Sequence, residues 1–224
     1  MDDVLSSAPL FAALDAEASA ALRTSMETTT VAKGDVLFHE GQLGDRMYII
    51  TDGKVKLGHT APDGRESILA ILGPGELLGE LSLFDPGPRT ATAIALTDLT
   101  ALGLGHAALR PWLTGRPEVA ESLLQALAQR LRRTNEALAD LVFSDVPGRV
   151  AKALLELGDK FGQQMPDGVH VTHDMTQEEL AQLVGASRET VNKALSEFAT
   201  RGWIKLESRS VVIIDSERLA RRSR

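Results

Sequence analysis

Short apolar runs separated by glycine-bearing turns fill the stretch from about residue 28 to residue 104. Two examples are residues 47–50 and 68–72, and glycines recur between the runs at fairly regular spacing. The pattern is typical of short antiparallel strands that close into a barrel or a jelly roll. A short amphipathic helix region at about residues 9–25, with Asp15 as a cap, precedes the strands. We therefore predict an N-terminal β domain.

A long helix is predicted over residues 117–143, because nothing breaks a helix after Pro117, a residue that favours the first helical turn. Seam residues recur along it at alternating intervals of four and three. They are Ala120, Leu124, Leu127, Leu131, Thr134, Leu138 and Leu141. A narrow stripe sustained in this way is typical of a coiled-coil seam. We predict a homodimer through this helix; the alternative is that the stripe packs on the protein's own β domain.

One residue of the seam, Thr134, is polar, and Asn135 follows it. A single polar residue in a seam often specifies the register of the two helices at a cost in stability. The other interpretation is that Thr134 and Asn135 face a ligand held between the helix and the β domain. The spacing leaves both interpretations open.

A helix-turn-helix is predicted near the C-terminus. Thr176 and Glu179 match a capping box that begins the first helix, which Gly185 ends. Ser187 is placed to cap a second helix that runs to about Thr200. Its core-facing side carries the apolar residues Val191, Ala194, Leu195 and Phe198. Two strands around a polar turn follow, at residues 203–206 and 211–214, and complete a winged helix.

The outward side of the second helix has the chemistry of a DNA-reading surface. Arginine bonds guanine with two donors, glutamate accepts from the cytosine amino group, and lysine serves guanine or phosphate. The hydroxyl groups of Ser187 and Thr190 are expected to lie where the phosphates of the DNA backbone would be. The predicted DNA-binding residues are Thr176, Ser187, Arg188, Glu189, Thr190, Asn192 and Lys193.

Residues 79–92 combine a glycine-led turn, a carboxylate, an arginine and hydroxyl groups. The turn amides near Gly79, the Arg89 guanidinium and the Thr90 hydroxyl together form a donor set that suits a phosphate. Glu80 would repel an anion unless it accepts hydrogen bonds from the ligand, as it would from a ribose 2′-OH. The alternative is an exposed Glu80–Arg89 pair on a loop, which would contribute little.

Composition is that of a globular chain, with 224 residues, 43% hydrophobic residues and a mean hydropathy of −0.05. This length allows one large or two modest domains. No run approaches the ~18 apolar residues of a membrane span, and the first residues do not match a signal peptide. The absence of cysteine excludes disulfides, thiolate metal sites and cysteine nucleophiles. We expect a cytoplasmic protein without membrane association.

Charge is divided unevenly along the chain. Residues 1–144 hold 12 Lys and Arg against 19 Asp and Glu, whereas residues 145–224 hold 12 against 12. A pI of about 5.3 is unusual for a nucleic-acid binder, but the neutral C-terminal part leaves DNA binding open. The basic stretch at residues 218–224 is predicted to be a frayed, solvated tail.

The histidines are predicted to be structural. His170 and His173 lack a third ligand of the kind a metal site needs, and His39 and His59 are treated in the same way. A cupin-type metalloenzyme, which would share the β architecture, needs converging His and Glu ligands that the predicted strands lack. We expect neither a metal site nor catalytic residues.

Taken together, the motifs resemble the CRP/FNR family of bacterial transcription regulators, in particular its cyclic AMP-responsive members. The resemblance covers essentially the whole chain. The segments that carry it are residues 79–92, the Thr134-Asn135 pair, residues 143–151 and residues 187–191. It implies an α+β fold with a cyclic-nucleotide-binding β roll (jelly roll), a long dimerisation helix and a winged helix-turn-helix. The implied domains are residues 1–115, 116–144 (helix and hinge) and 145–224.

The resemblance also implies cyclic AMP as an allosteric ligand. Glu80 would accept from the ribose 2′-OH, Arg89 and Thr90 would hold the cyclic phosphate, and Thr134 and Asn135 would meet the adenine amino group. The implied ligand-binding residues are Gly79, Glu80, Leu81, Arg89, Thr90, Thr134 and Asn135, with Leu57, Leu69 and Leu78 walling the base.

The implied partners are double-stranded DNA with palindromic half-sites resembling TGTGA, a second copy of the chain, and RNA polymerase. Two positions depart from the best-known relatives: Lys193 stands where they carry arginine, and Asn135 where they carry serine. The alternatives are a regulator of the same fold that responds to another small ligand, and one that binds DNA without a ligand.

Overall fold

The computed structural model describes residues 2–12, 14–85 and 87–223, which form two compact units. The first unit comprises residues 1–59 and 69–132, and the second comprises residues 60–68 and 133–224. The predicted domain boundaries at residues 115/116 and 144/145 stay predictions.

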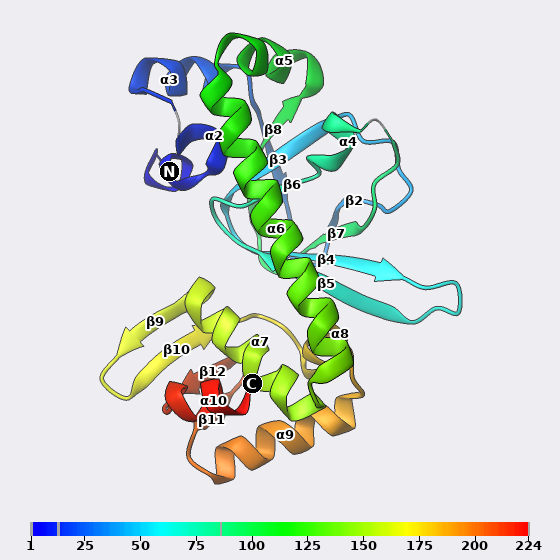
Figure 1. Ribbon diagram of the computed structural model, residues 1–224, viewed down its shortest axis with the longest axis vertical. Helices are drawn as coiled ribbons and strands as arrows, with labels where there is room; N and C mark the ends of the chain where they lie inside the picture. The colour runs from blue at the N-terminus through cyan, green and yellow to red at the C-terminus, as the bar shows by residue number, and fades with distance from the viewer. Residues whose placement is uncertain (1, 13, 86, 224) are drawn as a thin grey trace. The chain divides into compact units, whose positions relative to one another are not determined.

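The first half of the chain contains three short helices, eight strands and two further helices among its described residues (Figure 1). The elements are α1 (Asp2–Ser7), α2 (Pro9–Ala12), α3 (Ala16–Thr24), β1 (Glu27–Val31), β2 (Val36–Phe38), β3 (Arg46–Asp52), β4 (Val55–Thr60), β5 (Glu66–Leu72), β6 (Leu77–Leu78), α4 (Leu81–Phe84), β7 (Thr92–Ala95), β8 (Leu99–Gly105) and α5 (His106–Gly115).

Two antiparallel four-stranded sheets form the predicted β roll, in the orders β1-β8-β3-β6 and β2-β7-β4-β5. Side chains of a strand alternate between its two faces, and β3 is buried on both of them. Tyr48 and Ile50 belong to one apolar cluster with Phe38, Leu57 and other residues of the second sheet. The intervening Met47 and Ile49 belong to a second cluster, which includes residues of α1, α2, α3, α5 and the start of helix 117–143. The jelly-roll prediction is confirmed.

The long helix α6 (Pro117–Phe143) has the predicted bounds. Its buried residues, Val119 and Leu123, join the helix-side cluster of the first unit. The seam residues Leu124 and Leu131 do not share this packing, because they are 65% and 62% exposed. These two seam leucines therefore do not pack on the protein's own β roll. No described helix, α6 included, combines the length and apolarity needed to cross a membrane.

The second unit contains the predicted winged helix-turn-helix (Figure 1). Its elements after α6 are α7 (Val146–Phe161), β9 (Gly162–Met165), β10 (Gly168–Thr172), α8 (Gln177–Val184), α9 (Arg188–Thr200), β11 (Ile204–Glu207), β12 (Ser210–Ile213) and α10 (Ser216–Arg222). The Thr176–Glu179 capping box is present, and Gly185 ends α8 at a φ of 64° that glycine adopts without strain. Ser187 caps α9, whose predicted core residues are buried.

The wing strands belong to a larger sheet than predicted, in the order β11-β12-β10-β9. The β9–β10 hairpin had no sequence prediction because β9 reads Gly-Gln-Gln-Met and is exposed at every position. A strand of this kind lacks the apolar alternation on which strand prediction rests.

The basic C-terminal stretch is ordered as α10, so the prediction of a frayed tail is wrong for the described residues 218–223. Asp215 caps the helix by accepting from the Arg218 backbone N–H at 2.9 Å, and Leu219 is completely buried. The arginines are paired with acids. The pairs are Arg218–Asp215, Arg221–Glu217 and Arg222–Asp145.

Candidate functional site

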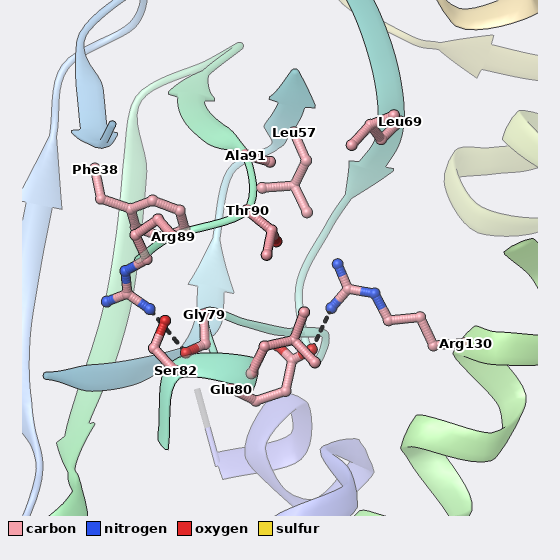
Figure 2. A pocket seen from close by; sticks show the side chains of 11 residues that line it. Phe38, Leu57, Leu69, Gly79, Glu80, Ser82, Arg89, Thr90, Ala91 and Arg130 are labelled. Atoms are coloured by element: carbon pink, nitrogen blue, oxygen red, sulfur yellow. Dashed lines mark hydrogen bonds and ion pairs between the residues drawn. The ribbon is translucent and has the colours of Figure 1, made fainter. Parts of the chain in front are cut away.

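A cavity of about 60 Å³ lies in the first unit, where β4 and β5 face the segment from β6 to β7 (Figure 2). It brings together seven of the ten residues predicted to bind the ligand. The lining comprises Phe38, Leu57, Leu69, Gly79, Glu80, Leu81, Ser82, Arg89, Thr90, Ala91 and Arg130. Leu69, Leu81 and Thr90 are exposed and form the solvent side of the lining.

Arg89 is buried, with 5% of its surface exposed. Its Nη1 donates to the Gly79 carbonyl and its Nη2 to the Arg46 carbonyl, both at 2.7 Å, and the guanidinium carbon lies 4.3 Å from the centre of the Phe38 ring. Its Nε is buried without a hydrogen-bond partner. Within the described chain no carboxylate forms an ion pair with it, and burial lowers the pKa of its guanidinium. A buried cation in this condition is stabilised by an anion.

Gly79 is required by the position of this guanidinium. Its φ of 76° favours glycine, and a Cβ at this position would collide with Arg89 Nη1. The absence of a side chain lets the Gly79 carbonyl accept from Arg89 while the chain turns into α4 (Figure 2).

Glu80 is 2% exposed, so the alternative of an exposed Glu80–Arg89 pair on a loop is wrong. Its Oε1 accepts from Arg130 Nη1 at 2.6 Å, and its Oε2 is buried without a hydrogen-bond partner. A buried carboxylate oxygen without a partner is costly, and a hydroxyl donor entering the cavity would satisfy it. The cavity therefore offers a cationic donor at Arg89 and a free acceptor at Glu80.

Arg130 was not predicted. It reaches Glu80 from α6, fifty residues along the chain (Figure 2). The sequence did contain a signal for Arg130, because it lies one helical turn before Thr134 and residues four apart lie on the same face of a helix. If Thr134 lies beside a ligand, residue 130 is expected near that ligand as well.

Three predicted ligand residues lie outside this lining. Leu78 belongs to β6 of the first sheet, is completely buried in the apolar cluster that both sheets share, and does not line the cavity. Thr134 and Asn135 are exposed on the part of α6 that belongs to the second unit. A contact between these residues and the base stays a prediction.

The predicted DNA-reading side of α9 is exposed at Arg188, Glu189 and Lys193. Lys193 Nζ lies 3.0 Å from Glu189 Oε1, so two of the base-reading side chains pair with each other. The hydroxyls of Ser187 and Thr190 lie 2.9 Å apart beside the helix cap. Thr176 is exposed at the start of α8, where its hydroxyl accepts from the Glu179 backbone N–H at 3.1 Å.

Asn192 was predicted to lie on the outward side of α9, but the structure differs. The residue is half-buried, and its Oδ1 is buried without a hydrogen-bond partner. Its position follows Val191, which is completely buried, so Asn192 lies at the edge of the outward side. The carbonyl end of this amide does not face outward with Arg188 and Lys193.

The histidines of β10 and the following loop hold structural contacts. His173 is buried and its Nδ1 accepts from the Met175 backbone N–H at 3.1 Å, while His170 Nε2 lies 2.7 Å from Asp167 Oδ1. Within the described ranges, no group of three or more His, Asp or Glu side chains is arranged to hold a metal ion.

Comparison with known proteins agrees with this two-part arrangement. A family model of the cyclic nucleotide-binding domain matches residues 28–114, and a model of the Crp-like helix-turn-helix domain matches residues 148–222. A CRP-like cAMP-activated global transcriptional regulator of Mycobacterium tuberculosis is 57% identical over 224 residues, which is 100% of both chains. The cyclic AMP receptor protein of Thermus thermophilus is 37% identical over 198 residues, 88% of each chain.

A solved structure is also similar. The crystal structure of a CRP-family transcriptional regulator from Thermus thermophilus matches with a TM-score of 0.74 at 27% identity. The match covers 87% of this chain and 96% of that one.

Proposed function

Because the chain belongs to the CRP family of transcription regulators, which are not enzymes, we propose that it is a cyclic AMP-responsive homodimer that binds palindromic DNA. In this proposal the ligand binds in the β roll and changes DNA affinity through the dimer helix. The protein acts in the cytoplasm, with RNA polymerase as a further partner. The proposed domains are residues 1–115, 116–144 and 145–224.

One observation carries the ligand proposal. A single cavity contains a buried guanidinium with no carboxylate partner, Arg89, and a buried carboxylate oxygen with no donor, Glu80 Oε2. A cyclic nucleotide joins a phosphate anion to a ribose hydroxyl, so it satisfies both groups at once. An anion without a hydroxyl donor satisfies only the first, which favours a ligand that carries both groups, as a cyclic nucleotide does.

Nucleotide binding needs more room than the cavity offers. Its volume of about 60 Å³ is small beside the ~300–1,000 Å³ of typical small-molecule clefts. In this proposal Leu69 and Leu81, which are 59% and 46% exposed, move outward and then cover the base. Thr134 and Asn135 would complete the site by meeting the adenine amino group, and Leu78 would support the wall from the core.

The seam of α6 supports the dimer proposal. Its leucines at positions 124, 131, 138 and 141 are all exposed large apolar residues, which is unfavourable unless a partner covers them. A seam of this kind pairs two copies of one helix. The two α9 helices of such a dimer would bind half-sites one DNA turn apart, about 34 Å.

The direct test is a titration of a fluorescent palindrome, with half-sites resembling TGTGA, in the absence and presence of cyclic AMP. Allosteric coupling is typically about 1–3 kcal/mol, so we expect DNA affinity to change about 5- to 150-fold. Calorimetry on the same preparation should show about one cyclic AMP bound per chain. Equal DNA affinity in both conditions together with no heat at millimolar cyclic AMP would contradict the proposal. Cyclic GMP and inorganic phosphate serve as comparison ligands.

A second prediction concerns Arg188. The substitution Arg188→Ala should cost about 1–3 kcal/mol on the cognate site and relax the preference at one base pair, because a two-donor contact with guanine is lost. Competition with single-base variants of the site measures this. Arg201→Ala is the control, since Arg201 pairs with Glu197 at the other end of α9. An equal loss on random DNA would show that Arg188 contacts only phosphate.

A further inference from the structure

The C-terminal helix α10 is bonded to Asp145, the second residue after α6. Asp145, the N-cap of α7, accepts from the Gly148 backbone N–H through Oδ1 at 2.9 Å. Its other oxygen, Oδ2, accepts from Arg222 Nη2 at 2.6 Å, although the two residues lie 77 positions apart. One carboxylate therefore both caps α7 and bonds the end of the chain.

The packing around this pair is close. A Cβ on Gly148 would lie 3.1 Å from Asp145 Oδ1 and 3.3 Å from the Arg222 carbonyl oxygen. Leu219, one turn before Arg222, is completely buried and anchors α10 independently of the ion pair. Burial of Leu219 thus holds α10 against the unit, and the Arg222–Asp145 pair fixes the C-terminal end of α10 against the first turn of α7.

The first turn of α7 is in turn bonded to the helix-turn-helix. The Arg149 guanidinium donates Nη1 to the Ser144 carbonyl at 2.7 Å and Nε to the Val184 carbonyl at 2.9 Å. Its Nη2 donates to the Gly185 carbonyl at 3.3 Å. Val184 and Gly185 form the end of α8, just before the turn that leads to α9. A continuous set of hydrogen bonds therefore runs from α10, through the residues that follow α6, to the helices that read DNA.

We propose that Arg222 is a positioning residue that holds the N-cap of α7 and so sets the orientation of the helix-turn-helix after α6. This proposal rests on the proposed function, because one of its measurements is the change in DNA affinity with cyclic AMP. In this proposal Arg222 acts through its hydrogen bond to Asp145, and not through a contact with DNA or nucleotide.

The charge state of the pair is constant over the range of an ordinary binding assay. The hydrogen bond from Arg222 lowers the pKa of the Asp145 carboxyl, and the same bond raises the pKa of Arg222. The two side chains are 62% and 30% exposed, so the pair contributes little to stability itself. A change in DNA binding without a large change in stability is therefore the signature of a positioning role.

The test compares Arg222→Ala with Arg221→Ala in the full-length protein. Arg221 is the neighbouring residue of α10 and pairs with Glu217 on the same helix at 3.2 Å, so the control removes the same charge without touching α7. DNA affinity is measured with and without cyclic AMP, and thermal unfolding is followed in parallel. We expect Arg222→Ala to change DNA affinity, or its ratio between the two conditions, at least ~3-fold relative to Arg221→Ala, about 0.65 kcal/mol.

Two further variants separate the pair from the cap. Asp145→Ser keeps a capping acceptor for the Gly148 N–H but loses the second oxygen that bonds Arg222. Its effect should match that of Arg222→Ala, and the double variant should be no worse than either single one. Arg222→Lys keeps the charge, so its DNA affinity should lie between that of Arg222→Ala and that of the wild type.

The outcomes are distinct. Binding constants for Arg222→Ala equal to those of Arg221→Ala would overturn the proposal, as would a lower unfolding temperature with unchanged DNA binding. Additive effects of Asp145→Ser and Arg222→Ala would overturn it as well. If the wild type showed no response to cyclic AMP, the proposed function would fail, while the positioning role would be decided by ligand-free DNA affinity alone.

Discussion

Replacing Arg89 with glutamine is expected to raise the dissociation constant for cyclic AMP at least ~100-fold, about 2.7 kcal/mol. A hydrogen bond to a charged group contributes about 1.5–3 kcal/mol, and Arg89 would make such bonds to the cyclic phosphate in a buried site. Glutamine keeps side-chain N–H donors but has no charge. The ligand-dependent change in DNA affinity should disappear together with binding.

Calorimetry with cyclic AMP measures the effect, and far-ultraviolet circular dichroism verifies the fold. The matched control is Arg116→Gln. Arg116 lies in the same unit, between Asp15 and Glu118 at 3.8 and 3.9 Å, and takes no part in the cavity. The control should bind cyclic AMP as the wild type does. If Arg89→Gln bound cyclic AMP within 5-fold of the wild type, the phosphate assignment would be wrong.

Placing a charge in the middle of the α6 seam is expected to separate the dimer. In Leu131→Arg each chain loses an apolar contact, and full burial of a leucine contributes about 1.5–3 kcal/mol. In a symmetric dimer the substitution also brings two like charges to the same interface, which adds to the loss. The dissociation constant of the dimer should rise at least ~100-fold. Affinity for the palindrome should fall with it, because two linked α9 helices no longer bind together.

Sedimentation equilibrium over a range of protein concentrations measures the change. Gln129→Arg is the control, because residue 129 is two positions from Leu131 and so about 200° around the helix. It adds the same charge on the opposite side and should leave the dimer intact. Since Leu131 is 62% exposed in the single chain, Leu131→Arg should fold normally. A dimer of unchanged affinity in Leu131→Arg would place the interface elsewhere.

Local sequence signals predicted the elements that depend on neighbouring residues. The start of α6 at Pro117, the capping box at Thr176 and the caps at Asp15 and Ser187 all agree with the structure. Each of these signals acts through backbone groups within about four residues. The hairpin that contains β9 carried no such signal, because its polar strand depends on its pairing with β10 and has no apolar alternation of its own.

The packing of α6 was predicted only in part from the sequence. Its spacing predicted a seam that pairs two copies of the chain, which stays a prediction; Leu124 and Leu131 are exposed in the single chain. The same spacing did not show that Val119 and Leu123 form a second apolar contact toward the β roll. A helix that packs on two partners carries two overlapping stripes, and a heptad count detects only the more regular one.

The sequence by itself determined which groups are available: the glycine turn, Glu80, Arg89, the long helix and the reading side of α9. Only the tertiary structure decided their surroundings. It paired Glu80 with Arg130 from another element and left one carboxylate oxygen without a donor. It also buried Arg89 against Phe38 without a carboxylate partner among the described residues. Local bonding follows from neighbours in the chain, but burial and charge pairing depend on groups that only the fold brings together.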